Sequence, residues 1–260
     1  MITRILLYFE RLIFGSEKLF KFMILNEIED NSLFIEVGSS DLAETKMVLE
    51  KKTNVNIIVF EPDLRNINSY DYQILKNKRL KIIKKILSDS HGKKFFYFHK
   101  DFSNLNQLNK PSKKRLNYFY KKKISSTTLK KEIKKIRSCS KFVIKMDIEG
   151  FEYELIKNNL DFFRTKKKIS ILIELHPNYY FKNQMKNLIK KLIKFGYYFK
   201  LVESAGSVRP NVFKKKNYIP SKKSIQRGLY ANLDNDFVLN NAFNLIRGKK
   251  VIRSILLSNH

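Results

Sequence analysis

The pattern of hydrophobic and polar positions changes near residue 33. Before it, residues 1–22 start with an apolar run and then carry charges spaced along the segment, which predicts an amphipathic helix. After it, short apolar runs alternate with stretches of helical spacing, and this alternation predicts β–α–β units around a parallel sheet. The predicted strands are residues 33–37, 56–60, 80–87, 142–147, 169–175 and 197–203, with a seventh at 236–239.

Helices are predicted in the intervals between these strands. Their ranges are residues 42–51, 67–75, 128–136, 152–157 and 185–195, followed by a closing helix at 242–257. Residues 94–99 alternate aromatic and polar side chains after Gly92, which indicates a hairpin or an excursion strand. Residues 104–126 and 204–232 are rich in lysine and turn-forming residues, and we expect both to be loops.

The expected fold class is therefore α/β, with a doubly wound, mostly parallel sheet of seven strands. This domain is expected to span residues 33–240, with loop insertions near 101–126 and 204–232. A helical extension, residues 1–32, precedes it, and a C-terminal helix, residues 241–260, follows it.

The composition narrows the class of protein further. The chain has 260 residues, of which 43% are hydrophobic, and this fraction excludes a wholly disordered chain. Cys139 is the single cysteine, which excludes an intramolecular disulfide framework and fits a reducing compartment. The longest apolar stretches fall short of the ~20 residues that a membrane-spanning helix needs. We therefore expect a cytoplasmic protein with no transmembrane segment.

The formal net charge is +29, from 53 Lys and Arg residues against 24 Asp and Glu residues. A basic surface for nucleic acid, for an anionic membrane surface or for a phosphorylated substrate is one interpretation. However, lysine dominates and occurs in scattered short runs such as 121–123 and 214–216, whereas planar recognition favours arginine. A compositional bias is the preferred interpretation, and contact with a membrane surface stays open.

Acidic residues mark the ends of the first two predicted strands. The first strand contains Glu36 and ends at Gly38, and the second ends at Glu61, 23 positions after Gly38. Ligands bind at the carboxyl ends of strands in a doubly wound sheet, and an acid at an offset of ~20 residues holds a ribose diol. Carboxylates at both tips suit a positively charged nucleoside better than a polyphosphate.

Further acids follow other strands of the predicted sheet. Ser88 and Asp89 follow the third strand, and Asp147 and Glu149 lie in the octet 145–152 after the fourth. All of these residues are expected at one edge of the sheet.

Five blocks of this sequence, in the same order, resemble the FkbM family of S-adenosylmethionine-dependent methyltransferases. They are residues 36–40, 60–63, 86–92, 145–152 with 127–129 before it, and 173–176. The resemblance covers residues 33–203. It implies a class I methyltransferase with a Rossmann-like fold and S-adenosylmethionine as cofactor. It also implies methyl transfer to a hydroxyl of a sugar, a glycan or a small metabolite.

The resemblance further assigns roles to single residues. Glu36 and Gly38 are expected to shape the methionine pocket, Glu61 to hold the ribose hydroxyls, and Ser88 or Asp89 to lie by the adenine. The complete expected cofactor-binding set is Glu36, Gly38, Ser39, Ser40, Asp41, Glu61, Pro62, Ser88 and Asp89. The candidate catalytic residues, which would assist deprotonation of the acceptor, are Asp147, Glu149 and His176.

Some of these residues have a second interpretation. Asp147 and Glu149 are equally suited to capping the helix that follows Gly150, and His176, before Pro177, fits a structural turn. A metal site of Asp147, Glu174 and His176 has acceptable ligand chemistry, but no spacing rule supports it, so no metal is expected.

Two other functions stay open. Leu42 stands where the family usually has a second glycine, which leaves a catalytically degenerate relative as an alternative. A basic protein that binds or methylates nucleic acid is the other, but the chain lacks an Asn/Asp-Pro-Pro-aromatic sequence after the fourth strand to hold a flipped base. The acceptor is expected to contact residues 104–126 and 204–232, whose lysines favour an anionic molecule.

Overall fold

The computed structural model describes most of the chain. The described residues are 18–39, 41–63, 65, 72–102, 105–134, 136, 139–165, 167–179, 182–246 and 249–260. Most of the predicted amphipathic helix 1–22, and Ser40 of the predicted cofactor site, lie outside them.

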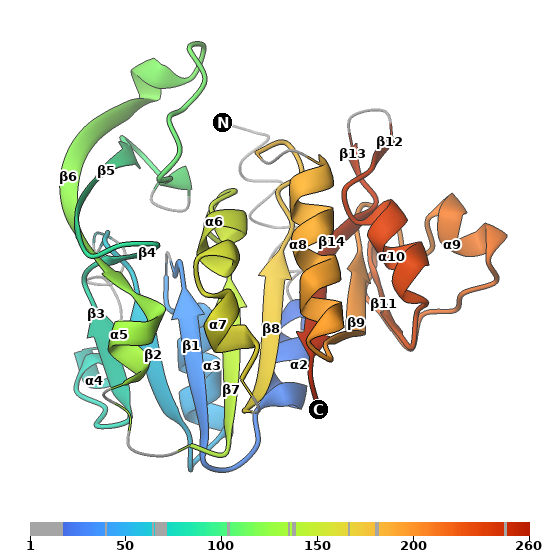
Figure 1. The fold of residues 1–260 in the computed structure, drawn as a ribbon, viewed down its shortest axis with the longest axis horizontal. Helices are drawn as coiled ribbons and strands as arrows, with labels where there is room; N and C mark the ends of the chain where they lie inside the picture. The colour runs from blue at the N-terminus through green and yellow to red at the C-terminus, as the bar shows by residue number, and fades with distance from the viewer. Residues whose placement is uncertain are drawn as a thin grey trace.

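A large mixed sheet forms the centre of the molecule (Figure 1). Among the described residues it has nine strands, in the order β10-β11-β9-β14-β8-β7-β1-β2-β3. Their bounds are β1 Ser32–Val37, β2 Asn56–Phe60, β3 Leu80–Ile83, β7 Lys141–Met146, β8 Lys168–Glu174, β9 Tyr198–Ser204, β10 Lys222–Lys223, β11 Gly228–Ala231 and β14 Ile252–Ser258. The expected α/β class is confirmed. Six of the predicted strands are present in this sheet, at least in part, and β10, β11 and β14 are additional to them.

The neighbouring strands β8, β7, β1, β2 and β3 are all parallel to one another. The chain runs from β1 outward through β2 to β3, and then returns to β7 on the other side of β1. The strand order therefore reverses between β1 and β7, and their carboxyl ends diverge into helices on opposite faces. This reversal is the position at which doubly wound sheets bind ligands.

Helices cover both faces of the sheet. Their bounds are α2 Lys18–Glu27, α3 Ala43–Lys51, α4 Tyr72–Leu75, α5 Leu129–Ile133, α6 Glu152–Lys157, α7 Leu160–Phe163, α8 Lys182–Lys194, α9 Asn211–Lys215 and α10 Asn235–Asn241. Successive side chains of β1 show why two layers are needed, because strand side chains alternate between faces. Phe34 packs in the apolar cluster with α2 and α3, whereas Leu33 and Ile35 pack in the cluster with α5 to α8 and α10.

A smaller sheet stands as an arm beside the carboxyl edge of the main sheet (Figure 1). It consists of β4 Ile86–Ser88, β5 Gly92–His99 and β6 Phe119–Thr128, in the order β4-β6-β5. The predicted excursion strand after Gly92 is confirmed as β5. The expected loop 104–126 is wrong from Phe119 onward, because β6 pairs with the whole of β5. The single strand predicted at 80–87 is two strands, which belong to different sheets.

Two predictions near the C-terminus are wrong. The segment 236–239, predicted as a strand, lies in α10. The N-cap of this helix is Asp234, whose side chain accepts a hydrogen bond from the backbone N–H of Phe237 at 2.8 Å. The segment 242–257, predicted as a closing helix, instead contains β12 Leu245–Ile246 and β13 Lys249–Lys250, which pair with each other, and most of β14, which pairs with β8 and β9 on its two sides. A strand buried on both faces has a continuous apolar run, and periodicity does not separate such a run from a buried helix.

The expected loop 204–232 is also wrong in part, because it contains α9, β10 and β11. Among the described helices, none has both the length and the apolar character required to cross a membrane.

One buried carboxylate connects α2 to the main sheet. The carboxylate of Glu27, at the end of α2, lies 3.0 Å from Lys141 Nζ of β7 and 2.8 Å from Lys200 Nζ of β9, and accepts a hydrogen bond from Ser170 of β8 at 2.7 Å. Burial opposes ionisation, but Lys200, Ser170 and Lys141 together hold the pKa of Glu27 below its usual range. This carboxylate therefore contributes stability at neutral pH that is lost as acid protonates it.

We predict that Lys141→Met destabilises the protein by about 3–5 kcal/mol, because the substitution leaves the buried carboxylate of Glu27 without its buried partner. Urea-induced unfolding of both proteins at pH 7 measures the difference. Lys191→Met, at an exposed position of α8, is the control and should change the free energy of unfolding by less than about 0.5 kcal/mol. Equal effects of the two substitutions would contradict the prediction.

Candidate active site

A cleft of about 230 Å³ opens at the carboxyl ends of the parallel strands, where the strand order reverses. Most of the residues predicted for the site line it. They are Gly38, Ser39, Asp41, Glu61, Pro62, Asp147, Glu149 and His176. Acidic side chains from three strand ends therefore share one cavity.

Gly38 allows the tips of β1 and β7 to approach closely. Its φ is +77°, and a Cβ added there would lie 2.2 Å from the carbonyl oxygen of Asp147 and 2.9 Å from the side chain of Ile148. Any other residue at this position would therefore clash with the backbone of Asp147 and would also have to adopt a strained conformation. The close approach brings Asp147 beside the turn that follows β1.

Glu61 connects the tips of β1 and β2. Its buried carboxylate accepts hydrogen bonds from the backbone N–H of Ser39 at 2.9 Å and of Asp63 at 2.8 Å, one at each oxygen. Burial raises the pKa of Glu61 to about 8, against the opposing effect of these two hydrogen bonds. Each carboxylate oxygen keeps a second lone pair for another donor, such as a ribose hydroxyl.

Glu36 lies beneath the cleft instead of lining it. The side chain is fully buried, accepts a hydrogen bond from the hydroxyl of Thr45 at 2.6 Å, and lies 3.4 Å from Lys145 Nζ. Lys145 lines the cleft and also donates to the carbonyl oxygen of Gly38 at 2.6 Å. From its position beneath the cleft, Glu36 thus holds Lys145 and, through Thr45, α3 in place.

The predicted adenine-side residues are also outside the lining. Ser88 is buried and donates to Asp89 Oδ1 at 2.7 Å, and Asp89 pairs with Lys94 at 2.5 Å. The two residues before them, Ile86 and Leu87, line the cleft instead.

Leu42 does not fill the cleft. The side chain is buried in the apolar cluster that includes Phe20 and Val48 and is absent from the lining. Its backbone has φ 55°, a left-handed conformation that costs an ordinary residue about 1–2 kcal/mol. Glycine takes this conformation without that cost, which explains why leucine is unusual at this position. The leucine side chain nevertheless leaves the cavity open.

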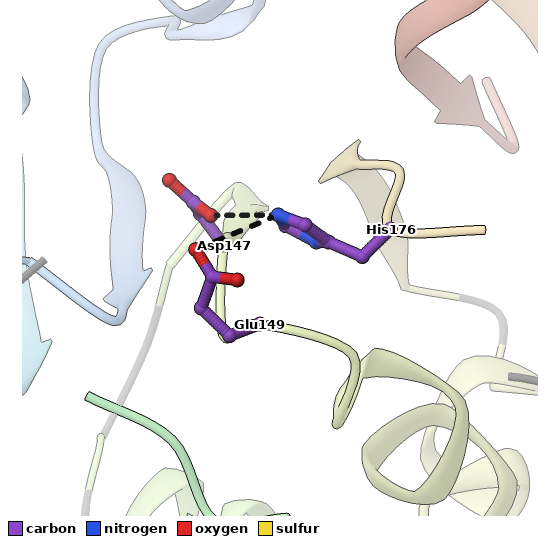
Figure 2. A group of neighbouring side chains, drawn as sticks. All are labelled: Asp147, Glu149 and His176. Carbon is purple, nitrogen blue, oxygen red and sulfur yellow. Dashed lines mark ion pairs between the residues drawn. The ribbon is translucent and has the colours of Figure 1, made fainter. Parts of the chain in front are cut away.

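Asp147, Glu149 and His176 meet at the ends of β7 and β8 (Figure 2). His176 Nε2 lies 3.8 Å from Asp147 Oδ1 and 3.9 Å from Glu149 Oε1. Neither acid is the N-cap of α6, because the N-cap of that helix is Phe151, which makes no side-chain hydrogen bond to it. The alternative interpretation of both acids as helix caps is therefore wrong.

The buried carboxylate of Glu152 positions the ring of His176. Glu152 Oε1 lies 3.0 Å from His176 Nδ1 and also accepts a hydrogen bond from the backbone N–H of Ile148 at 3.1 Å. Burial favours the neutral ring, but Glu152, Asp147 and Glu149 together raise the pKa of His176 to about 9. Burial and neighbouring carboxylates also raise the pKa of Asp147 and of Glu149.

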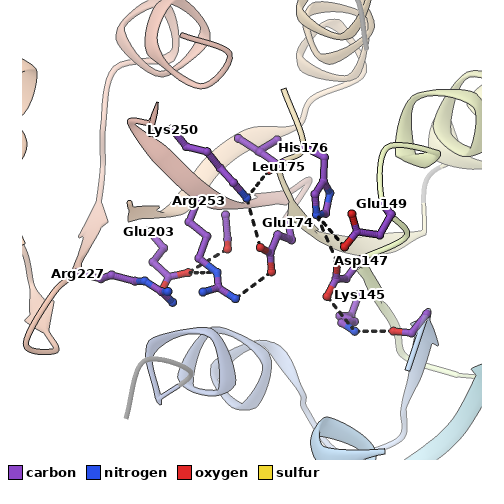
Figure 3. Close-up of polar contacts among 12 residues, drawn as sticks. Lys145, Asp147, Glu149, Glu174, Leu175, His176, Glu203, Arg227, Lys250 and Arg253 are labelled. Atoms are coloured by element: carbon purple, nitrogen blue, oxygen red, sulfur yellow. Dashed lines mark hydrogen bonds and ion pairs between the residues drawn. The ribbon is translucent and has the colours of Figure 1, made fainter. Parts of the chain in front are cut away.

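Glu174 belongs to a separate network (Figure 3). Its carboxylate lies 3.0 Å from Arg253 and 3.4 Å from Lys250. Burial opposes ionisation, yet Arg253 and Lys250 lower the pKa of Glu174 to about 2. The structure thus joins Glu149, and not Glu174, to the pair of Asp147 and His176.

Sequence reasoning missed several residues that line the cleft, among them Glu44, Lys145 and Arg253. Arg253 lies on β14, which the sequence suggested was a helix. Residues 106–108, which belong to the expected acceptor segment 104–126, line the cleft. No residue of the segment 204–232, which includes the lysine run 214–216, is among the lining residues.

The strand order, the reversal between β1 and β7 and the acids at the strand tips define the Rossmann-like fold of class I methyltransferases. A family model described as the methyltransferase FkbM domain matches residues 36–199, which is more than half of the chain. The chain belongs to the FkbM methyltransferase family. The expected enzyme class is thereby confirmed.

Other comparisons give distant similarity. No curated protein matches the chain. The chain is similar to precorrin-6y C5,15-methyltransferase from Geobacter metallireducens, with a TM-score of 0.42, 8% identity, and coverage of 92% of this chain and 85% of that chain. It is also similar to a candidate methyltransferase from Streptococcus mutans in complex with SAH, with a TM-score of 0.40, 9% identity, and coverage of 93% and 96%.

We predict that Gly38→Ala destabilises the protein by more than Gly196→Ala does. Both glycines have positive φ, at +77° and +95°. A Cβ added at Gly38 would clash with the backbone of Asp147, whereas a Cβ added at Gly196 would lie in open space. Gly196→Ala should therefore cost only the conformational strain of about 1–2 kcal/mol, and Gly38→Ala should cost this plus the displacement of β7. Thermal unfolding of the two variants checks the order, and an equal loss would contradict the close contact.

Proposed function

We propose that this protein transfers a methyl group from S-adenosylmethionine to a hydroxyl of a sugar, a glycan or a small metabolite. The observation that carries the proposal is the cleft into which acidic side chains that follow β1, β2 and β7 converge with His176 after β8, at the reversal of strand order in a chain of the FkbM family.

The donor half of the cleft has the chemistry for a nucleoside. Glu61 offers two carboxylate oxygens for ribose hydroxyls, and Gly38 gives a ligand access to the backbone at the end of β1. Phe60, Leu87 and Phe96 supply an apolar wall that suits a purine ring. When bound, S-adenosylmethionine supplies an electrophilic methyl group on a positively charged sulfur.

The acceptor half contains Asp147, Glu149 and His176. Methyl transfer to an alcohol needs the hydroxyl to lie in line with the methyl and to lose its proton as the new bond forms. Burial raises the pKa of Asp147 and Glu149, which makes each carboxylate a better proton acceptor near neutral pH. In this proposal a carboxylate of this group receives the proton. Asn106 and Gln107 of the arm face the same cavity and help to select the acceptor.

The pH dependence of nucleoside binding tests the role of Glu61. We expect the affinity for 5′-methylthioadenosine to rise about tenfold from pH 7 to pH 9, because the ionised fraction of a carboxyl group with a pKa of about 8 rises by about that factor. This ligand has the ribose diol but no amino acid group that titrates in the range. Isothermal titration calorimetry measures the change. Glu61→Gln should bind weakly and show no such dependence.

Transfer is tested with donor carrying a labelled methyl group and an extract of glycans and metabolites. We expect label in an acceptor with the unmutated protein, and a loss of at least about 100-fold with Asp147→Asn, because a general base contributes 10²–10⁴ in rate. The same variant should bind 5′-methylthioadenosine normally. Binding without transfer to any acceptor would favour a degenerate family member, and no nucleoside binding at all would contradict the proposal.

A further inference from the structure

The group of Asp147, Glu149 and His176 has the geometry of a metal site. Each residue offers one oxygen or nitrogen atom, and these atoms lie within 4.8 Å of one another. The separations of His176 Nε2 from the two carboxylates, 3.8 and 3.9 Å, exceed hydrogen-bond distances. Three atoms bound to one cation at about 2.1 Å lie about 3–4 Å apart, so small side-chain movements would close the site.

The surroundings hold His176 in the orientation of a metal ligand. Glu152 is fully buried and engages Nδ1 of the ring at 3.0 Å, while Nε2 points toward Asp147 and Glu149 (Figure 2). A carboxylate behind a histidine is the usual arrangement around bound metal ions, where it fixes the ring and raises the basicity of the ligating nitrogen. The hydrogen bond from Ile148 to Glu152 ties this second carboxylate to the same loop.

The charge balance also favours a cation. Asp147, Glu149 and Glu152 surround one imidazole, and Glu152 Oε2 is buried without a hydrogen-bond partner among the described residues. Lys145 approaches Asp147 only at 3.9 Å and is engaged by Glu36 and Gly38. Even when the imidazole of His176 is protonated, its single positive charge does not balance the three carboxylates.

The neighbouring cations are engaged elsewhere. Arg253 and Lys250 pair with Glu174, and Arg227 pairs with Glu203 (Figure 3). Among the described residues, the deficit of positive charge at Asp147, Glu149 and Glu152 is therefore not made up by the basic side chains nearby.

We propose that Asp147, Glu149 and His176 bind a divalent cation, and that this cation holds the acceptor hydroxyl in the cleft. Two carboxylates and one imidazole suit Mn²⁺ or Mg²⁺, and three protein ligands leave coordination positions for water or for acceptor oxygens. A hydroxyl bound to the cation would have a lowered pKa, and its proton would pass to the oxygen of Asp147 or Glu149 that does not hold the cation. The role in acceptor binding rests on the proposed methyltransferase function, whereas the metal site itself does not.

Mn²⁺ binding to the full chain, after removal of metals with EDTA, tests the site without any acceptor. Electron paramagnetic resonance measures the Mn²⁺ that stays free in solution. The titration should show that one ion binds per chain, with a dissociation constant in the micromolar range. Glu149→Gln and His176→Gln should each weaken binding at least tenfold, and Glu152→Gln, which acts through His176, should weaken it 10- to 100-fold. Asp161→Asn, at an exposed position of α7, is the control and should bind as the unmutated protein does.

Thermal unfolding verifies that each variant is folded, and 5′-methylthioadenosine binding is measured on the same samples with EDTA and with Mn²⁺. Nucleoside binding in both conditions, with no Mn²⁺ binding, would overturn the metal site and leave the proposed function standing. Mn²⁺ binding that is lost in Glu149→Gln, without nucleoside binding in either condition, would support the site and contradict the proposed function. Equal Mn²⁺ affinity of Glu149→Gln and the unmutated protein would overturn the assignment of ligands.

Discussion

The close approach of the β1 tip to the β7 tip at Gly38 is the constraint on which the site depends. The two strands are neighbours in the sheet, yet their chains continue to opposite faces, so that a space opens at their carboxyl ends. With no side chain at Gly38, the carbonyl of Asp147 lies against the turn after β1. The donor-side carboxylate of Glu61 and the acceptor-side carboxylate of Asp147 consequently face one cavity instead of two.

Charge is arranged in the cleft by pairing some ions and leaving others without a full partner. Glu36 engages Lys145 below the cavity, and Glu174 engages Arg253 and Lys250 at one side. These pairs are structural, because each carboxylate has a cation within 3.4 Å. Glu61 and Glu149 are different: burial raises the pKa of both, which marks them as groups whose charge is stabilised poorly by the protein alone.

Much of this could be predicted from the sequence. Strands such as β1 and β7 are short, mostly apolar runs with an acid near or just after the last residue, and both the parallel sheet and the edge at which acids gather follow from that pattern. The C-terminal strand β14 could not be predicted, because Ile252–Ser258 is buried on both sides and lacks the alternation of a half-exposed strand. Arg253 was missed in consequence. The partners of Glu36 and His176 were also beyond prediction, because Thr45 and Glu152 are brought to them only by tertiary packing.

The arm of β4, β5 and β6 has a consequence for how such an enzyme can diverge. In the part of the chain that the structure describes, its strands pair with one another and with no strand of the main sheet, and the chain leaves the main sheet after β3 and returns through α5. An insertion between β5 and β6 would therefore reshape the wall formed by Asn106 to Leu108 while every hydrogen bond of the central strands stayed in place. Selection can thus change the residues that line this wall of the cleft without changing the central strands that support the site.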